Sequence, residues 1–147
     1  MRKFIMKMGL SYIMRYRYLE HTADLYVEAR GKNLEEIFSN CAFALYDSIC
    51  DINKISQTEV RVVEAEGDDE QEILVNFLNE LLYLFETEGF VASDVDVALN
   101  GKKLTARLKG EIYDREKHGA KYEIKAATYH GLEINEKEGY ARVLFDI

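Results

Sequence analysis

The chain contains no proline, no low-complexity segment and no internal repeat. Stretches rich in proline, glycine or serine usually connect domains, and no such linker is found here. A length of 147 residues is sufficient for one domain with a complete hydrophobic core. We therefore expect a single domain at residues 14–147. Residues 1–13 are treated as an N-terminal extension, because Met14 is a natural start before the first strand.

Long apolar runs are also missing. No run approaches the roughly 18 to 20 residues that a membrane helix needs, and the basic, apolar stretch 1–8 lacks a signal-peptide core and cleavage site. The two cysteines, Cys41 and Cys50, are too few and too far apart for a metal knuckle or a thioredoxin-type pair. Cys41 falls on the apolar side of a predicted helix, so we expect it to be buried and inert. This cysteine usage predicts a reducing compartment, the cytoplasm.

Positive charge is in short supply. There are 19 Lys and Arg residues against 27 Asp and Glu residues, a formal net charge of −8. Such a chain repels phosphate backbones, which argues against strong direct nucleic-acid binding across a broad face. Cations or a basic protein are therefore better candidates for a binding partner than nucleic acid is. Phosphate-binding glycine loops, nucleophile elbows, zinc motifs and kinase signatures are absent from the sequence.

What the chain does contain is two amphipathic helical patterns. The first predicted helix spans Leu34–Ile49, with Asn33 and Glu36 as a capping pair. Phe43 and Tyr46 fall on its polar side, which predicts either a contact surface or a cover formed by the N-terminal extension. The second predicted helix spans residues 70–85 and has a wide apolar arc that is typical of a helix buried against a sheet. Gly89 is expected to end it.

The remaining segments alternate in the manner of strands. The predicted strands are residues 16–19, 25–29, 59–65, 91–99, 103–109, 121–129, 132–134 and 140–147. Asn100 and Gly101 mark a hairpin between two of them, and the charged segment 114–119 is expected to be a solvated loop. The pattern favours an α+β fold: a two-layer sandwich in which two main helices pack on a mixed sheet of about eight strands.

Two polar features stand out against this framework. The turn Glu20–Asp24 places an imidazole, a hydroxyl and a carboxylate within four residues, although Thr22 or Asp24 could simply cap the turn. At the other end, Asp146 precedes the terminal residue Ile147. Two anionic groups at the end of a strand need a cation or an arginine nearby.

Four stretches of the sequence together resemble the archease family. They are Glu20–Asp24, Leu74–Tyr83, Lys125–Leu132 and Val143–Ile147. They occur in the family's order and spacing, from about Met14 to the last residue. The charged segment Tyr113–His118 is also similar to a loop of that family, but Arg115 stands where a proline is expected.

The resemblance implies a protein cofactor of the RtcB-type RNA ligase, the enzyme that joins tRNA halves in splicing. Such a cofactor promotes guanylylation and multiple turnover of the ligase and is not itself an enzyme. The family's metal site would correspond to Asp24, Asp146 and Ile147. These hard oxygen ligands suit Ca²⁺ first, with Mg²⁺ and Mn²⁺ as alternatives. The first and last strands would then have to be neighbours in the sheet.

Five further polar residues are candidates for contacts with the partner or its nucleotide site. They are His21, Glu80, Lys125, Thr128 and His130. Three of them also have a simpler interpretation: Glu80 as a solvated residue at the edge of a helix, Thr128 as a sheet hydroxyl and His130 as a turn-stabilising residue.

Two rival functions remain open from the sequence. The chain could be a metal-dependent hydrolase that uses Asp24 and Asp146 as ligands and Glu80 or His21 as the base, which predicts a deep pocket beside the metal. It could instead be a general chaperone or scaffold. That function predicts a large exposed apolar patch around Phe43 and Tyr46.

Overall fold

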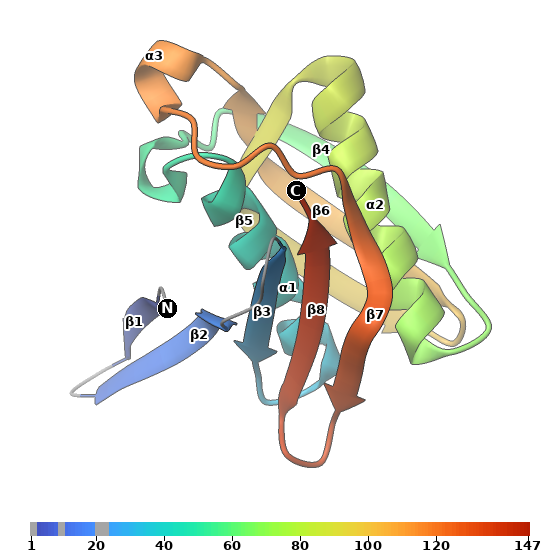
Figure 1. Cartoon of the computed structure of the whole chain (residues 1–147). Helices are drawn as coiled ribbons and strands as arrows, with labels where there is room; N and C mark the ends of the chain where they lie inside the picture. The colour runs from blue at the N-terminus through green and yellow to red at the C-terminus, as the bar shows by residue number, and fades with distance from the viewer. Residues whose placement is uncertain (1–2, 9–10, 20–23) are drawn as a thin grey trace.

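The computed structural model describes residues 3–8, 11–19 and 24–147, with side chains from Arg15 onward. The elements in chain order are β1 (Lys3–Met8), β2 (Ser11–Leu19), β3 (Leu25–Arg30), α1 (Leu34–Ile49), the short 3₁₀ helix η1 (Ile52–Lys54), β4 (Glu59–Glu66), α2 (Glu70–Glu88), β5 (Phe90–Asn100), β6 (Lys103–Ile112), α3 (Arg115–His118), β7 (Ala126–Asn135) and β8 (Tyr140–Asp146). The α+β class and the two main helices agree with the sequence (Figure 1). The number of strands agrees as well, but β1 lies in the extension, where no strand was predicted, and β7 spans parts of two predicted strands.

The strands form two sheets, which corrects the expectation of one mixed sheet. Five strands pair in the order β1-β2-β3-β8-β7, and three pair in the order β4-β6-β5. Every ladder between the described strands is antiparallel. In Figure 1, β3, β8 and β7 stand in front of α1, and β5, β6 and β4 stand behind it. Both long helices contact both sheets. Helix α1 packs on β5 of one sheet and on β3 of the other, so it lies between two β layers.

Helix side chains explain why the strands do not merge into one sheet. On α2, Asn79 hydrogen-bonds the backbone of β7, while Asn76 donates to the Glu66 carbonyl of β4 at 2.8 Å. On α1, Ser39 donates to the Val95 carbonyl of β5 at 2.6 Å, and Glu35 accepts from the Leu99 N–H at 3.0 Å. Edge strands expose unpaired backbone groups that would otherwise recruit another strand. The helices satisfy those groups and keep the two sheets apart.

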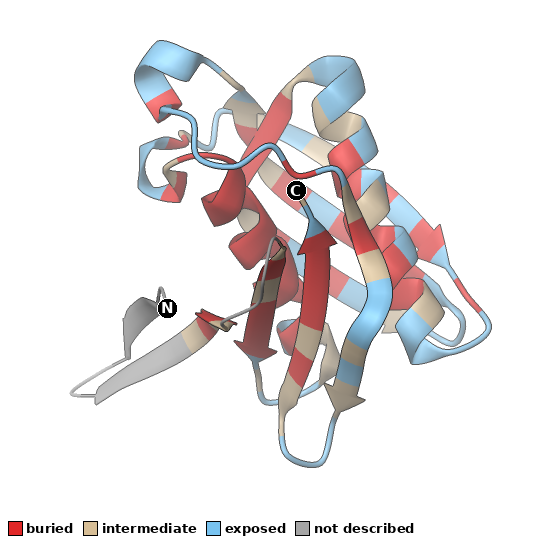
Figure 2. Ribbon diagram, in the orientation of Figure 1, coloured by how far each residue is buried: buried red, intermediate tan, exposed pale blue. Residues whose placement is uncertain are grey.

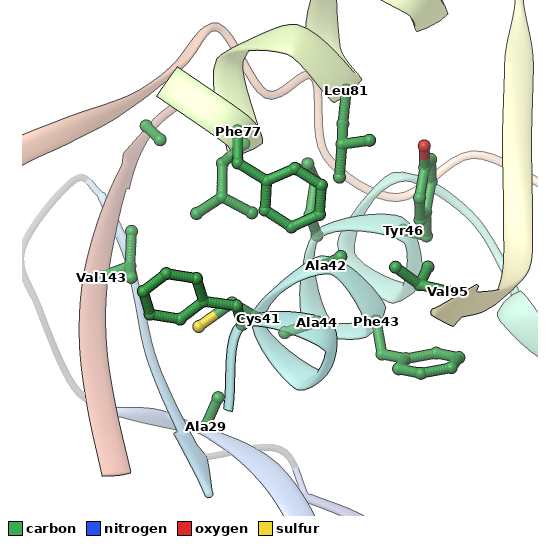
Figure 3. Packing of buried hydrophobic residues seen from close by; sticks show 14 of the residues in the cluster. Ala29, Cys41, Ala42, Phe43, Ala44, Tyr46, Phe77, Leu81, Val95 and Val143 are labelled. Atoms are coloured by element: carbon green, nitrogen blue, oxygen red, sulfur yellow. The ribbon is translucent and has the colours of Figure 1, made fainter. Parts of the chain in front are cut away.

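Helix α1 is buried on almost every side (Figure 2). Asn33 caps it by accepting the Glu36 N–H at 2.9 Å, as predicted. Phe43 and Tyr46 are buried rather than exposed, so the contact surface and the apolar patch expected of a chaperone are both wrong (Figure 3). Because two sheets enclose α1, even most of the polar side of this helix is buried, and the periodicity of its sequence alone did not reveal this.

Helix α2 borders the other side of the core. Its C-cap Gly89 has a positive φ of 71°, which a residue without Cβ adopts easily, so the predicted end of the helix is confirmed. Among the described residues, no helix combines the length and the apolar character that a membrane crossing requires. Cys41 is buried as expected, and burial raises the pKa of its thiol to about 12.

The segment Lys121–Lys125 is not a strand, contrary to the sequence pattern. The backbone N–H groups of Lys121 and Tyr122 donate to the Ile49 and Ser48 carbonyls at 3.0 and 2.9 Å. These contacts satisfy carbonyls at the end of α1 that have no partner within the helix. The segment therefore caps α1 before the chain enters β7.

The charged segment after Tyr113 is exposed to solvent, as expected, except at His118, which is buried, and its residues Arg115–His118 form the short helix α3 instead of a loop. His118 accepts the Asp114 N–H on Nδ1 at 2.9 Å, so its proton lies on Nε2, 2.8 Å from Glu111. Lys117 donates to the same carboxylate at 2.7 Å. The hydrogen bond from Lys117, with further bonds from the Ser56 N–H and His118, lowers the pKa of Glu111 to about 2.

Candidate functional site

The turn near the start of the chain and the end of the last strand meet at one end of the five-stranded sheet. Strand β3 pairs with β8, and Leu25 lies opposite Phe145. Asp24 and Asp146 are the next residues outward in that register. Both belong to the face opposite the core, because Leu25 and Phe145 are buried and side chains alternate along a strand. Directly opposed residues have Cβ atoms roughly 4.5–5.5 Å apart. The strand that follows Asp24 and the last strand are therefore neighbours in the sheet, as the metal site requires.

Strand β7 completes this end of the sheet. The Lys125 N–H donates to the Asp146 carbonyl at 2.7 Å, and Ala126 lies opposite Asp146. The C-terminus lies next to the segment that leads into β7 (Figure 1). Ile147 packs against the core in a partly buried position. The carboxylates of Asp24 and Asp146, the terminal carboxylate and the Lys125 backbone thus belong to one end of three adjacent strands.

The chemistry of this donor set suits a hard cation. Carboxylate oxygens and water are the ligands that Ca²⁺ and Mg²⁺ take, and neither ion needs nitrogen or sulfur. Within the residues that the structure describes, no group of three His, Cys, Asp or Glu side chains could hold a metal ion. The third anionic group at this end would be the carboxylate of Ile147, and the remaining positions would fall to water or to a partner.

The other candidate residues are distributed unevenly. His21 lies outside the described residues. Thr128 donates to the Leu144 carbonyl at 3.0 Å and so acts as a sheet hydroxyl. Lys125 and His130 are exposed. Glu80 is exposed too, as the simpler alternative predicted, and lines a hollow of about 410 Å³ between α2 and β4 with Glu64 and Glu66.

A row of charges crosses the same sheet face further along the strands. Glu28 on β3 is 0% exposed and accepts from Arg17 at 2.8 Å, Arg30 at 3.2 Å and Arg142 at 3.0 Å. Arg142 also donates to Glu133 of β7 at 3.0 Å. Burial acts to raise the pKa of Glu28, but the hydrogen bonds from Arg17 and Arg142 outweigh it and the pKa is lowered. The row fixes the register of the strands that carry Asp24 and Asp146.

Residues 16–147 match the sequence model of the archease protein family. The chain belongs to the archease family.

Archease relatives cover nearly all of the chain. The Pyrococcus abyssi protein archease is 44% identical over 126 residues, which are 83% of this chain and 89% of that protein. The Archaeoglobus fulgidus protein archease is 42% identical over 139 residues, 91% of this chain and 100% of that protein. These matches confirm the resemblance that the four sequence stretches indicated.

Solved structures agree with the archease fold. The solution structure of Methanobacterium thermoautotrophicum protein 1598 has a TM-score of 0.77 at 31% identity and covers 90% of this chain and 99% of that one. A Thermotoga maritima archease, described as a possible chaperone, has a TM-score of 0.60 at 23% identity, covering 88% and 94%. The second likeness concerns the fold alone.

The departure from the archease pattern at Arg115 is compatible with the structure. Arg115 is the first residue of α3, where proline is favoured because that N–H has no partner within the helix. Asp114 before it has φ −130° and ψ 115°, close to the conformation that a residue preceding proline adopts. Arginine also suits this position, so the substitution leaves the segment around His118 intact.

Sequence reasoning missed Asn79, which ties α2 to the archease site. Its side-chain amide donates to the Ala127 carbonyl at 3.2 Å, and its carbonyl accepts the Ala127 N–H at 2.9 Å. The side chain thus takes the place of a neighbouring strand. Ala127 directly follows Ala126, the partner of Asp146. The position of Asn79 on the narrow polar side of α2 was the available signal, but nothing in the sequence indicated which strand Asn79 would contact.

Replacing Asn79 by alanine is expected to destabilise the protein by about 1–2 kcal/mol, because two backbone groups of β7 lose their partners. Amide hydrogen exchange at Ala127 should accelerate before that of β8. Asn76→Ala is the matched control, since it removes the bond to Glu66 on the other sheet. Equal acceleration at Ala127 in both variants would contradict a local role for Asn79.

Proposed function

We propose that this archease binds a divalent cation and activates an RtcB-type RNA ligase in tRNA splicing, in the cytoplasm. In this role it promotes guanylylation and repeated turnover of the ligase and catalyses no reaction of its own. The single observation that carries the proposal is the register of the β3–β8 ladder, whose last pair, Leu25 and Phe145, directly adjoins Asp24 and Asp146. Membership of the archease family supports the same conclusion.

The ion would be held by the carboxylates of Asp24 and Asp146 and by the terminal carboxylate of Ile147. Ca²⁺ is the first candidate because it accepts variable numbers of oxygen ligands, and Mg²⁺ and Mn²⁺ are the alternatives. When bound, the ion supplies positive charge that can orient and neutralise phosphate oxygens. Without it, the clustered carboxylates would repel one another.

The chain's own residues would contribute position and charge. The backbone bond from Lys125 to the Asp146 carbonyl fixes the start of β7 beside the carboxylates. The exposed ammonium of Lys125 is then available to a phosphate group of the partner's nucleotide. His21, Glu80, Thr128 and His130 are proposed as secondary contacts. Of these, Thr128 already donates its hydroxyl proton to the Leu144 carbonyl, so its oxygen would serve the partner as a hydrogen-bond acceptor.

Asp24→Asn is expected to weaken Ca²⁺ binding roughly 100-fold, because even groups that only support a metal ligand contribute 10–100-fold to affinity. Isothermal titration calorimetry of the isolated protein with Ca²⁺, Mg²⁺ and Mn²⁺ measures this effect. Asp68→Asn is the control, since Asp68 is highly exposed and lies before α2. The control should bind the ion as the wild type does.

The functional test is multiple-turnover RNA joining and guanylylation by the ligase, with wild type, Asp24→Asn and Asp68→Asn at matched folding. We expect acceleration by wild type and Asp68→Asn and its loss in Asp24→Asn. No acceleration by wild type would remove the cofactor function. Equal acceleration by Asp24→Asn would remove the metal mechanism. Turnover of RNA without any ligase would favour the hydrolase.

A further inference from the structure

A polar groove runs along the outer edge of β5, away from the carboxylate end of the other sheet. Its main part is a hollow of about 500 Å³ between α1, β5 and β2. A second hollow of about 250 Å³ continues past η1 and shares Arg15 and Phe43 with the first. Arg15 therefore lies where the two hollows adjoin, and the two together are called the groove here.

Arg15 covers Phe43 in this groove. Its guanidinium carbon lies 3.8 Å from the centre of the Phe43 ring, which is within cation–π distance. Phe43 is only 4% exposed, although the pattern of α1 places it on the polar side of the helix. Figure 3 shows Phe43 on the side of α1 that faces Val95 of β5. The ring is the apolar floor of the groove, and a cation lies on it.

Carboxylates line the same groove on two sides. Asp94 and Asp96 of β5 line the groove from one side, and Glu35 and Glu36 of α1 line it from the other. Burial lowers the pKa of Arg15, and the negative charges of Asp94 and Glu36 act against that decrease. Lys32 is the other basic residue of the main hollow. The groove therefore carries more negative than positive charge even with Arg15 in place.

Backbone pairing contributes little to recognition here. Ser39 and Glu35 already occupy the Val95 carbonyl and the Leu99 N–H on this edge of β5. A strand added to β5 would have to displace both side chains. Specificity must therefore come from side chains. A planar guanidinium stacks on a ring and reaches carboxylates with several donors at once, which a lysine ammonium does not match.

We infer that this groove is a recognition site for arginine, occupied by the chain's own Arg15, and that an arginine-bearing extended segment of a partner protein takes it by displacing Arg15. The charges agree with that occupant, since Glu35, Glu36, Asp94 and Asp96 line the groove against only two basic residues, Arg15 and Lys32. The site goes beyond the proposed metal function.

The test is an NMR titration of the full chain with a pentapeptide that has uncharged termini and one central arginine. Binding is followed through the signals of Phe43 and Val95. Arg15→Ala should bind the peptide at least about tenfold more tightly than wild type, because its own occupant is gone. In the Arg15→Ala background, Asp94→Asn removes one charge that faces the arginine of the peptide. This second change should weaken peptide binding about tenfold, which corresponds to about 1.4 kcal/mol. Adding Asp68→Asn instead should leave it unchanged.

The same peptide with lysine in place of arginine should bind more weakly to Arg15→Ala. Equal binding of the two peptides, equal binding by wild type and Arg15→Ala, or no effect of Asp94→Asn would each overturn the inference. If Arg15→Ala does not fold, Arg15→Lys replaces it, since that residue keeps the charge and the aliphatic stem. It should bind the arginine peptide more tightly than wild type, and failure to do so overturns the inference equally.

Discussion

Replacing Glu28 by glutamine is expected to lower the free energy of unfolding by about 3 kcal/mol, in the range found when one partner of a buried ion pair is removed. Glu28 is fully buried and receives hydrogen bonds from three arginines on three strands. Glutamine has the same shape but no charge. Three guanidinium groups would then lie close together without the carboxylate that holds them.

Urea unfolding of the two proteins at neutral pH measures the difference. Glu133→Gln is the matched control, because Glu133 pairs with the same Arg142 but its side chain is 48% exposed. Exposed ion pairs contribute about 0–1 kcal/mol, so the control should change stability little. Similar losses in the two variants would contradict a central role for Glu28.

The pH dependence of the Glu28 variant has a defined sign. The folded-state pKa of Glu28 is lowered from its usual value of 4.5, so its ionised form stabilises the fold above that value. This contribution is lost as the pH falls through the lower pKa of the folded state. The stability difference between wild type and Glu28→Gln should therefore be largest near neutral pH and should shrink on acidification.

Gly110→Ala is expected to destabilise the protein by at least about 3 kcal/mol, near the upper limit of overpacking effects. Strand β5 has a register shift between Ala92 and Asp94, which brings its backbone against Gly110 of β6. A Cβ on Gly110 would collide with the Val91 carbonyl oxygen and lie 2.7 Å from the Ala92 Cα. These are backbone atoms, so no side chain can rotate to make room.

Gly101→Ala separates collision from backbone strain. Gly101 has a positive φ of 64°, but a Cβ there meets no atom within 4 Å. Only conformational strain of about 1 kcal/mol is expected. Thermal unfolding followed by circular dichroism compares the two variants. A loss at Gly110 no larger than that at Gly101 would show that β5 can shift away from β6.

Local signals in the sequence were sufficient for the helices and for several of their ends. Asn33 and Gly89 act within one turn of the residues that they cap, so their roles could be predicted without knowledge of the fold. The hairpin at Asn100 and Gly101 is equally local, and Asn100 does pair with Lys103. These predictions depended on interactions between near neighbours in the sequence.

Polar partners that periodicity does not reveal, some distant and some near in the sequence, account for the features that were missed. Asn79 meets Ala127 and Lys121 meets Ile49, and no periodicity identifies such partners. His118 is buried because Glu111 and the Asp114 N–H satisfy both of its ring nitrogens, a network that resembles a solvated charge run in sequence. Polar side chains in these places hold backbone together, and their residue types alone do not distinguish that use from solvation.

The residues of the candidate site stay a prediction from the family resemblance, whereas their arrangement depended on the fold. Asp24 and Asp146 came from the family resemblance, and the β3–β8 pairing supplied the register that the sequence could only permit. The family resemblance gave no comparable indication of Asn79 or of the row of charges around Glu28. Both support the site through contacts between strands, which depend on the complete fold.

The enclosure of α1 by two sheets has a consequence for how the chain unfolds. Strand β5 from one sheet and strand β3 from the other both pack on this one helix, so neither sheet has a finished apolar face without it. Losing α1 exposes both sheets at the same time. The two sheets therefore cannot melt one after the other as separate units, and fluorescence and circular dichroism should trace a single cooperative transition.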